Sequence, residues 1–175
     1  GTGSNLKNLI KFSKIKNSPI SIILIISNTT QAKGLKYANQ FNIKKKIFNF
    51  QNFTDAEKNI STLLKKEKIK FICLAGFMKI LSKDFIKKFE GKIVNIHPSL
   101  LPKYKGLNTH NRAIKNQDKF AGCTVHYVTA QLDSGKTILQ KKIRITLKDN
   151  ETTLAKKVLK QEHKLYPAAI IKIFN

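Results

Sequence analysis

The sequence has few of the residues that mark disulfide-rich or membrane-spanning proteins. Its 175 residues include two cysteines, one methionine and no tryptophan. Cys73 and Cys123 lie in apolar runs without a partner spacing, and we expect both to be reduced core residues of a cytoplasmic protein. The apolar run at 20–27 has the length of a strand and is far too short to span a bilayer. No membrane association is therefore expected.

Acidic residues and arginine are also scarce. The chain carries 34 Lys and Arg residues against ten Asp and Glu residues, which gives a formal net charge of +24. Arg112 and Arg144 are the only arginines, and the lysines are spread over ordinary helix faces. Recognition of phosphate by planar, two-point hydrogen bonding generally uses arginine. The charge therefore favours an anionic substrate over nucleic acid, with a basic nucleic-acid-binding module as the alternative from a different class.

Apolar runs that alternate with helix-like segments predict an α/β fold in a single domain over 1–175. Strands are expected near 20–27, 46–50, 70–75 and 92–97, and helices near 4–14, 31–42, 54–68 and 82–89. Continuously apolar runs such as "FICLAG" are typical of strands buried on both faces of a parallel sheet. Further along, we expect a short helix at 109–117, an antiparallel strand pair at 122–130 and 136–145, and a last helix from Glu151 that continues past a kink at Pro167.

Three short motifs indicate where helices begin. "TDAE" at 54–57 has the pattern of a capping box, and "SKDF" at 82–85 is a looser start signal. "GTGSNL" at 1–6 places glycines directly before a helix, where free backbone N–H groups can bind phosphate. Such a loop normally follows a first strand, so we expect a further strand upstream of Gly1.

The segment "NIHPSLLPKYKG" at 95–106 carries the strongest chemical signal. Asn95 and His97 are two residues apart at the carboxyl end of an expected strand, so their side chains share one face. Ligands of open α/β sheets bind at this end of the strands. An asparagine amide can donate to a developing oxyanion and a histidine can transfer a proton near neutral pH, which suits attack on an acyl-level carbon. Asp133, in the turn "LDSG", either orients His97 or caps its own turn.

Five segments resemble one known family. "GTGSNL", "LAGFMKIL", "NIHPSLLPKYKG", "HYVTAQLDSG" and "QEHKLYP" occur in the order and spacing of glycinamide ribonucleotide formyltransferase, over essentially the whole chain. The resemblance implies a Rossmann-like formyltransferase fold, with a mostly parallel central sheet, helices on both faces and an antiparallel strand pair toward the C-terminus. It also implies metal-independent transfer of the formyl group of the cosubstrate 10-formyltetrahydrofolate to the amino group of glycinamide ribonucleotide, in purine biosynthesis.

The resemblance also assigns roles to particular residues. Its catalytic positions fall on Asn95 and His97, which would stabilise the oxyanion, and on Asp133, which would raise the pKa of His97 and help shuttle protons. The expected ribonucleotide-binding residues are Gly1, Thr2, Gly3, Ser4, Asn5 and Glu162. The expected folate-binding residues are Met78, Lys79, Ile80, Leu81, Asn95, Thr129, Ala130, Gln131, Leu132 and Asp133.

Some positions depart from the family's usual pattern, and Pro98 argues against the nearest alternative enzyme. Phe53 or a neighbour stands where a folate-contacting arginine is frequent. His110 and His126 are candidates for positions near the site, but structural roles are expected for both. Pro98 stands where a formyltetrahydrofolate deformylase typically has a second histidine. That deformylase, or another formyltransferase of the same fold, is the nearest alternative. We expect small-molecule substrates, no nucleic acid, and a monomer or weak homodimer.

Overall fold

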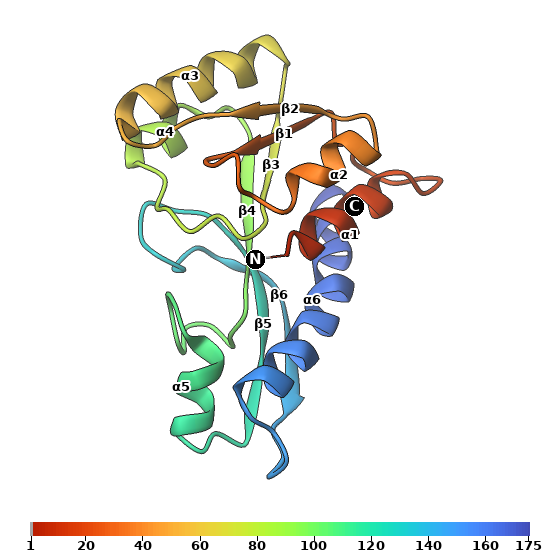
Figure 1. The fold of residues 1–175 in the computed structure, drawn as a ribbon, viewed down its shortest axis with the longest axis vertical. Coiled ribbons are helices and arrows are strands. Elements are labelled where there is room, and N and C mark those ends of the chain that lie inside the picture. The colour runs from red at the N-terminus through yellow and green to blue at the C-terminus, as the bar shows by residue number, and fades with distance from the viewer. Residues whose placement is uncertain (1) are drawn as a thin grey trace. The chain divides into compact units, whose positions relative to one another are not determined.

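The computed structural model describes residues 2–175, in which helices and strands alternate along the chain (Figure 1). The chain divides into two compact units, one that ends at Lys92 and one that runs from Ile93 to Asn175. The α/β class predicted from the sequence is confirmed. In the part of the chain that the structure describes, no helix is both long enough and apolar enough to cross a membrane.

The first unit contains two parallel strands and the helices that pack on them. Its elements are α1 (Ser4–Ser13), β1 (Leu24–Ser27), α2 (Leu35–Gln40), β2 (Lys44–Ile47), α3 (Phe53–Lys66), β3 (Phe71–Leu74) and α4 (Lys83–Lys88). β1 and β2 pair in parallel, with Leu24 opposite Lys44. Ile10 of α1, Ile25 of β1 and Leu35 of α2 belong to one buried cluster, so both helices cover the same small core.

The helix starts of the first unit follow the local sequence, with one correction. Ser82 caps α4 by accepting the N–H of Phe85, as "SKDF" predicted. The expectation that "TDAE" at 54–57 caps a helix at Thr54 is wrong by two residues, because α3 begins at Phe53 and its cap is Asn52. The side chain of Asn52 accepts the N–H of Asp55 and also donates to that carboxylate. Asn52 precedes Thr54 and satisfies the first turn before the threonine could do so.

The second unit is built on antiparallel strands. Its elements are β4 (Lys92–His97), α5 (Thr109–Lys115), β5 (Phe120–Tyr127), β6 (Thr137–Arg144) and α6 (Glu151–Phe174). The predicted antiparallel pairing of β5 with β6 is confirmed, and β5 also pairs antiparallel with β4. The sequence did not indicate this second pairing, because a continuously apolar run reveals burial on both faces but not strand direction.

Helix α6 covers β5 and β6 in the second unit (Figure 1). It begins at a capping box between Asn150 and Thr153, and it continues through Pro167 as predicted. Its buried side chains recur at helical spacing, among them Leu154, Val158 and Tyr166. The hydroxyl of Tyr166 donates to the carbonyl oxygen of Val94 at 3.1 Å, which ties the helix to β4.

A buried carboxylate in the first unit fixes the segment that carries Met78 to Leu81. Glu57 of α3 is 7% exposed, and one carboxylate oxygen accepts the backbone N–H of Ser82 at 2.8 Å. Its other oxygen accepts the hydroxyl of the same serine. The residue that caps α4 is therefore held to α3 from both its backbone and its side chain.

Replacing Glu57 should destabilise the protein measurably. In Glu57→Ala the N–H and hydroxyl of Ser82 lose their acceptor, and we expect the free energy of unfolding to fall by about 1–3 kcal/mol. Glu57→Gln keeps one acceptor oxygen and should lose less. Chemical denaturation followed by circular dichroism measures both. Glu90→Ala, at an exposed glutamate, is the matched control and should leave the unfolding midpoint unchanged. Equal midpoints for Glu57→Ala and Glu90→Ala would contradict the prediction.

Candidate active site

Polar side chains gather on one face of the β4–β5 pair. Asn95 lies opposite His126, and His97 lies opposite Thr124 in the antiparallel register. Directly paired residues, and residues two apart on one strand, project to the same side of a sheet. All four side chains therefore share a face, and the loops after β4 and β5 close over it.

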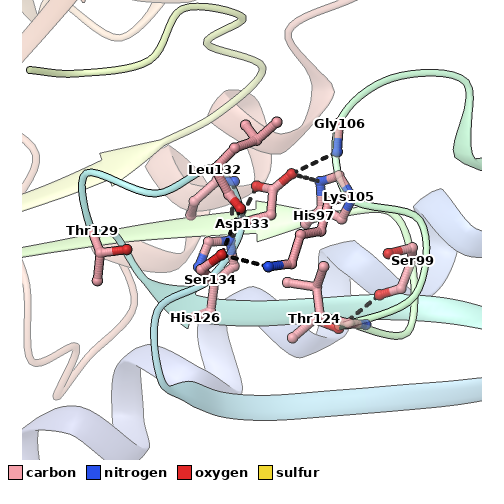
Figure 2. Close-up of polar contacts among 12 residues, drawn as sticks. His97, Ser99, Lys105, Gly106, Thr124, His126, Thr129, Leu132, Asp133 and Ser134 are labelled. Carbon is pink, nitrogen blue, oxygen red and sulfur yellow. Dashed lines mark hydrogen bonds and ion pairs between the residues drawn. The ribbon is translucent and has the colours of Figure 1, made fainter.

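His97 is nearly fully buried and lies between two acceptors. Its Nε2 is 2.9 Å from the carbonyl oxygen of Tyr104, and its Nδ1 is 3.3 Å from Oδ2 of Asp133. A carbonyl oxygen only accepts, so Nε2 carries a proton and donates it. Nδ1 faces a carboxylate, so the charged imidazolium is the form that satisfies both contacts. Figure 2 shows the carboxylate of Asp133 joined to His97 and to Gly106.

Opposing influences act on the pKa of His97. Burial lowers this pKa below its usual value, because it disfavours the charged ring. The Tyr104 carbonyl and the Asp133 carboxylate act in the opposite direction, whereas the neighbouring His126 and Arg112 lower the pKa further. The neutral ring is favoured overall, and Asp133 is the ionisable group that brings it closer to accepting a proton.

Asp133 is held ionised by its neighbours. The backbone N–H of Gly106 donates to its Oδ2 at 2.9 Å, the same oxygen that faces His97. Burial alone would raise the pKa of Asp133, but the neighbouring His126 ring, the hydrogen bond from the Gly106 N–H and the His97 ring lower it below its usual value. The side chain of Asp133 thus contacts His97 and the loop that contains Gly106, in addition to any contact within its own turn.

His126 connects Asn95 to Asp133, a role that the sequence did not reveal. Its Nδ1 donates to the carbonyl oxygen of Tyr127 at 2.8 Å, which leaves Nε2 free of a proton in the neutral ring. Nε2 lies 3.4 Å from the amide nitrogen of Asn95 and 3.6 Å from Oδ1 of Asp133. One amide hydrogen of Asn95 is therefore directed to His126. The only sequence signal was alternation of Thr124 and His126 in an apolar strand.

The loop after β4 is held by side chains from β5 and beyond. Thr124 donates to the carbonyl oxygen of Ser99 at 2.7 Å and accepts the N–H of Leu101 at 3.1 Å. The hydroxyl of Tyr104 donates to Asp118 at 2.8 Å. These contacts fix the backbone that supplies the Tyr104 carbonyl to His97.

The remaining expected site residues of the second unit lie on two elements. Residues 129–132 form an exposed stretch leading to Asp133, where the Thr129 hydroxyl donates to the carbonyl of Gln131 and Leu132 is 46% exposed. Glu162 is buried on α6. Burial, together with the nearby charge of Glu162, raises the pKa of the Cys123 thiol to about 12. The structure brings together Asn95, His97 and Asp133.

Expected site residues of the first unit lie at the start of α1 and between β3 and α4. Gly1 lies outside the described residues, Thr2 and Gly3 precede α1, and Ser4 and Asn5 are its first two residues. Gly3 has φ +77°, and a Cβ there would lie 2.5 Å from the Cα of Gly34, so glycine is required. Met78, Lys79 and Ile80 are exposed between β3 and α4, and Leu81 is buried. Over residues 2–175, no group of three His, Cys, Asp or Glu side chains could hold a metal ion.

The geometry defines an α/β protein with a buried, carboxylate-paired histidine beside an amide donor, an arrangement suited to acyl-level chemistry. The model of the formyl transferase family matches residues 1–170. Phosphoribosylglycinamide formyltransferase of Haemophilus influenzae is 40% identical over 173 residues, which cover 97% of this chain and 82% of that protein. The crystal structure of phosphoribosylglycinamide formyltransferase from Brucella melitensis is 41% identical with a TM-score of 0.94, covering 99% of this chain and 91% of that one.

A longer relative contains a matching segment. The trifunctional purine biosynthetic protein adenosine-3 of Gallus gallus is 39% identical over 173 residues. This match covers 97% of the chain, which spans only 17% of that relative's length. The chain belongs to the formyl transferase family and, within it, to the phosphoribosylglycinamide formyltransferases. The family and the Rossmann-like fold inferred from the five segments are thereby confirmed.

Removing the carboxylate of Asp133 should lower the pKa of His97 further. Asp133 stabilises the imidazolium, so Asp133→Asn removes one of the two influences that raise this pKa. NMR titration of the His97 ring in both proteins measures the shift. Asp84→Asn removes the same charge from an exposed position in the first turn of α4 and is the control. An unchanged or higher His97 pKa in Asp133→Asn would contradict the electrostatic role.

Proposed function

We propose that this protein transfers the formyl group of 10-formyltetrahydrofolate to the amino group of glycinamide ribonucleotide, a step of purine biosynthesis. The observation that carries the proposal is the buried His97, which lies between the Asp133 carboxylate and the Tyr104 carbonyl, on the same strand face as Asn95. Membership in the phosphoribosylglycinamide formyltransferases supports the choice of donor and acceptor. The donor is consumed as a cosubstrate.

In the proposed reaction, the amine nitrogen of the ribonucleotide attacks the formyl carbon, and the oxygen of the formyl group becomes an oxyanion. The amide hydrogen of Asn95 that His126 does not take would stabilise this oxygen. In its protonated form, which is the minor one at rest because burial favours the neutral ring, His97 would donate from Nδ1 to this oxygen. The Nδ1 contact with Asp133 is 3.3 Å and so is looser than the 2.9 Å contact at Nε2.

The collapse of the intermediate requires a proton transfer. The attacking nitrogen loses a proton, and the folate nitrogen gains one as its bond to the formyl carbon breaks. Asp133 and His97 would relay this proton through a water, so that the products are the formamide and tetrahydrofolate. Asp133 suits this role because it contacts His97 and is ionised at rest.

The substrate-binding residues are proposed from the family resemblance together with local structure. Gly1 to Asn5, with the left-handed Gly3 ahead of α1, would bind the ribonucleotide phosphate, and Glu162 another part of that substrate. Met78 to Leu81 and Thr129 to Asp133, together with Asn95, would bind the folate. Met78 to Ile80 and Thr129 to Leu132 are exposed, so their backbone groups could hydrogen-bond to a pterin edge.

Several predictions about the whole protein remain part of this proposal. A single formyltransferase domain over 1–175, a cytoplasmic location, and a monomer or weak homodimer stay predictions. So do the absence of a metal and of nucleic-acid binding. The charge of +24 would favour the anionic ribonucleotide and folate over neutral compounds.

A formyl-transfer assay tests the proposed reaction. Purified protein is given glycinamide ribonucleotide and a 10-formylfolate donor, and release of the deformylated folate is followed by absorbance. We expect release that requires the ribonucleotide, and a kcat in His97→Ala lower by about 100- to 10,000-fold. Thermal unfolding of the variant checks that it is folded.

Other outcomes would point elsewhere. Folate release without the ribonucleotide would identify a deformylase. No release from folded protein would contradict the proposed reaction, and full activity in His97→Ala would remove His97 from it.

A further inference from the structure

Arg112 is a chemical exception in this chain. Lysine supplies nearly all its positive charge, and Arg144 is the only other arginine. Arg112 lies in α5, and its Nη1 donates to the carbonyl oxygens of Lys105 at 2.7 Å and of Leu107 at 3.4 Å. Its guanidinium also lies over the ring of Tyr104, 4.8 Å from the ring centroid. One side chain thus contacts three successive parts of the loop that follows β4.

The carbonyl that Arg112 holds belongs to a peptide group with a second function. The carbonyl of Lys105 and the N–H of Gly106 form one planar trans peptide, so they point in opposite directions. The carbonyl accepts from Arg112, and the N–H donates to Oδ2 of Asp133 at 2.9 Å. The same oxygen lies 3.3 Å from Nδ1 of His97. A continuous series of contacts therefore runs from the guanidinium through one peptide to the histidine.

The other end of the loop reaches the opposite nitrogen of the same ring. The Tyr104 carbonyl accepts from Nε2 of His97, while its phenol ring lies against Arg112 and its hydroxyl donates to Asp118. Tyr104 has φ +58°, a conformation that a residue with a side chain keeps only when surrounding contacts hold it, whereas Gly106 adopts its φ of +77° freely. Arg112 contacts the tyrosine ring and the carbonyls on both sides of Gly106, so it holds the strained residue and limits the freedom of the glycine.

We infer that Arg112 is a positioning residue for the proposed formyl transfer: it holds residues 104–107 so that the Tyr104 carbonyl and the Gly106 N–H fix His97 and Asp133. This inference rests on the proposed function. A guanidinium is planar, so it stacks on a ring while it donates in its own plane to two carbonyls. A lysine ammonium at this position could reach a carbonyl but could not provide the flat contact with Tyr104. A charged donor on the Lys105 carbonyl also polarises the peptide and strengthens the Gly106 N–H as a donor to Asp133.

Activity measurements on two variants test the inference. In Arg112→Lys and Arg112→Gln we expect kcat to fall by about ten- to hundredfold, because a small displacement of catalytic groups has a large effect on rate. KM for both substrates should stay within about twofold, since Arg112 is not placed in either binding site. Arg144→Gln, at the other arginine, is the matched control and should keep wild-type kcat. Arg112→Lys keeps the charge, so it separates the planar contacts from charge alone.

A second measurement does not depend on activity. NMR hydrogen exchange of the Gly106 amide reports its bond to Asp133, and we expect faster exchange in both Arg112 variants but not in Arg144→Gln. The pH dependence of the His97 ring in the same samples reports its surroundings, where Asp133, His126, His110 and Arg112 are the charged or titratable groups. If either Arg112 variant unfolds, the other provides both readouts.

The outcomes separate the two proposals. Wild-type protein without formyl transfer would overturn the proposed function, whereas the Gly106 exchange rates would still decide whether Arg112 holds the loop. Active wild-type protein with unchanged kcat in Arg112→Lys and Arg112→Gln would overturn the positioning role. So would a loss that appears only in KM, or an unchanged Gly106 exchange rate. A kcat loss with faster exchange and nearly constant KM supports it.

Discussion

The arrangement of the loops in the second unit depends on one buried imidazole, that of His97, which needs hydrogen-bond acceptors on its ring nitrogens. An unpaired polar group in the interior costs about 1–3 kcal/mol, so a buried histidine must bring its partners with it. His97 has the Tyr104 carbonyl on one nitrogen and the Asp133 carboxylate on the other. These partners come from two different loops, and each loop is fixed by further contacts. The antiparallel pairing of β4 with β5 adds His126 and Thr124 to the same face.

Local electrostatics at this site oppose those of the chain as a whole. A net charge of +24 disfavours a further cation, but at physiological ionic strength charges beyond about 8 Å are largely screened. The buried groups near His97 are screened much less. Asp133 is one of only ten acidic residues, and it lies where a single carboxylate can act on two histidines. This placement keeps His97 able to take up a proton although burial and Arg112 lower its pKa.

The sequence predicts helices and strands that have a clear boundary residue better than it predicts contacts between side chains and main-chain groups. β4 occupies 92–97 as expected, because Pro98 ends its apolar run. The helix expected at 31–42 is confined to Leu35–Gln40, between Gly34 and Asn42, which has φ +51°. Asn95 and His97 share a face as their spacing required. The spacing of residues in the sequence did not predict the roles of His126 and Arg112. His126 meets Asn95 through the antiparallel pairing of β4 with β5, and Arg112 acts through main-chain carbonyls, which every residue type possesses.

Backbone groups supply two of the contacts at His97 and Asp133, the Tyr104 carbonyl and the Gly106 N–H. The site therefore requires a particular backbone conformation at these positions more than a particular residue type. Tyr104, Gly106 and Asp133 all have positive φ, at +58°, +77° and +45°. Only the glycine adopts this region freely, and the other two are held there at a cost of about 1–2 kcal/mol each. The hydrogen bonds that fix them are the same ones that orient the imidazole. The strain and the site are therefore maintained by one set of contacts, so loosening the loop would also release the histidine.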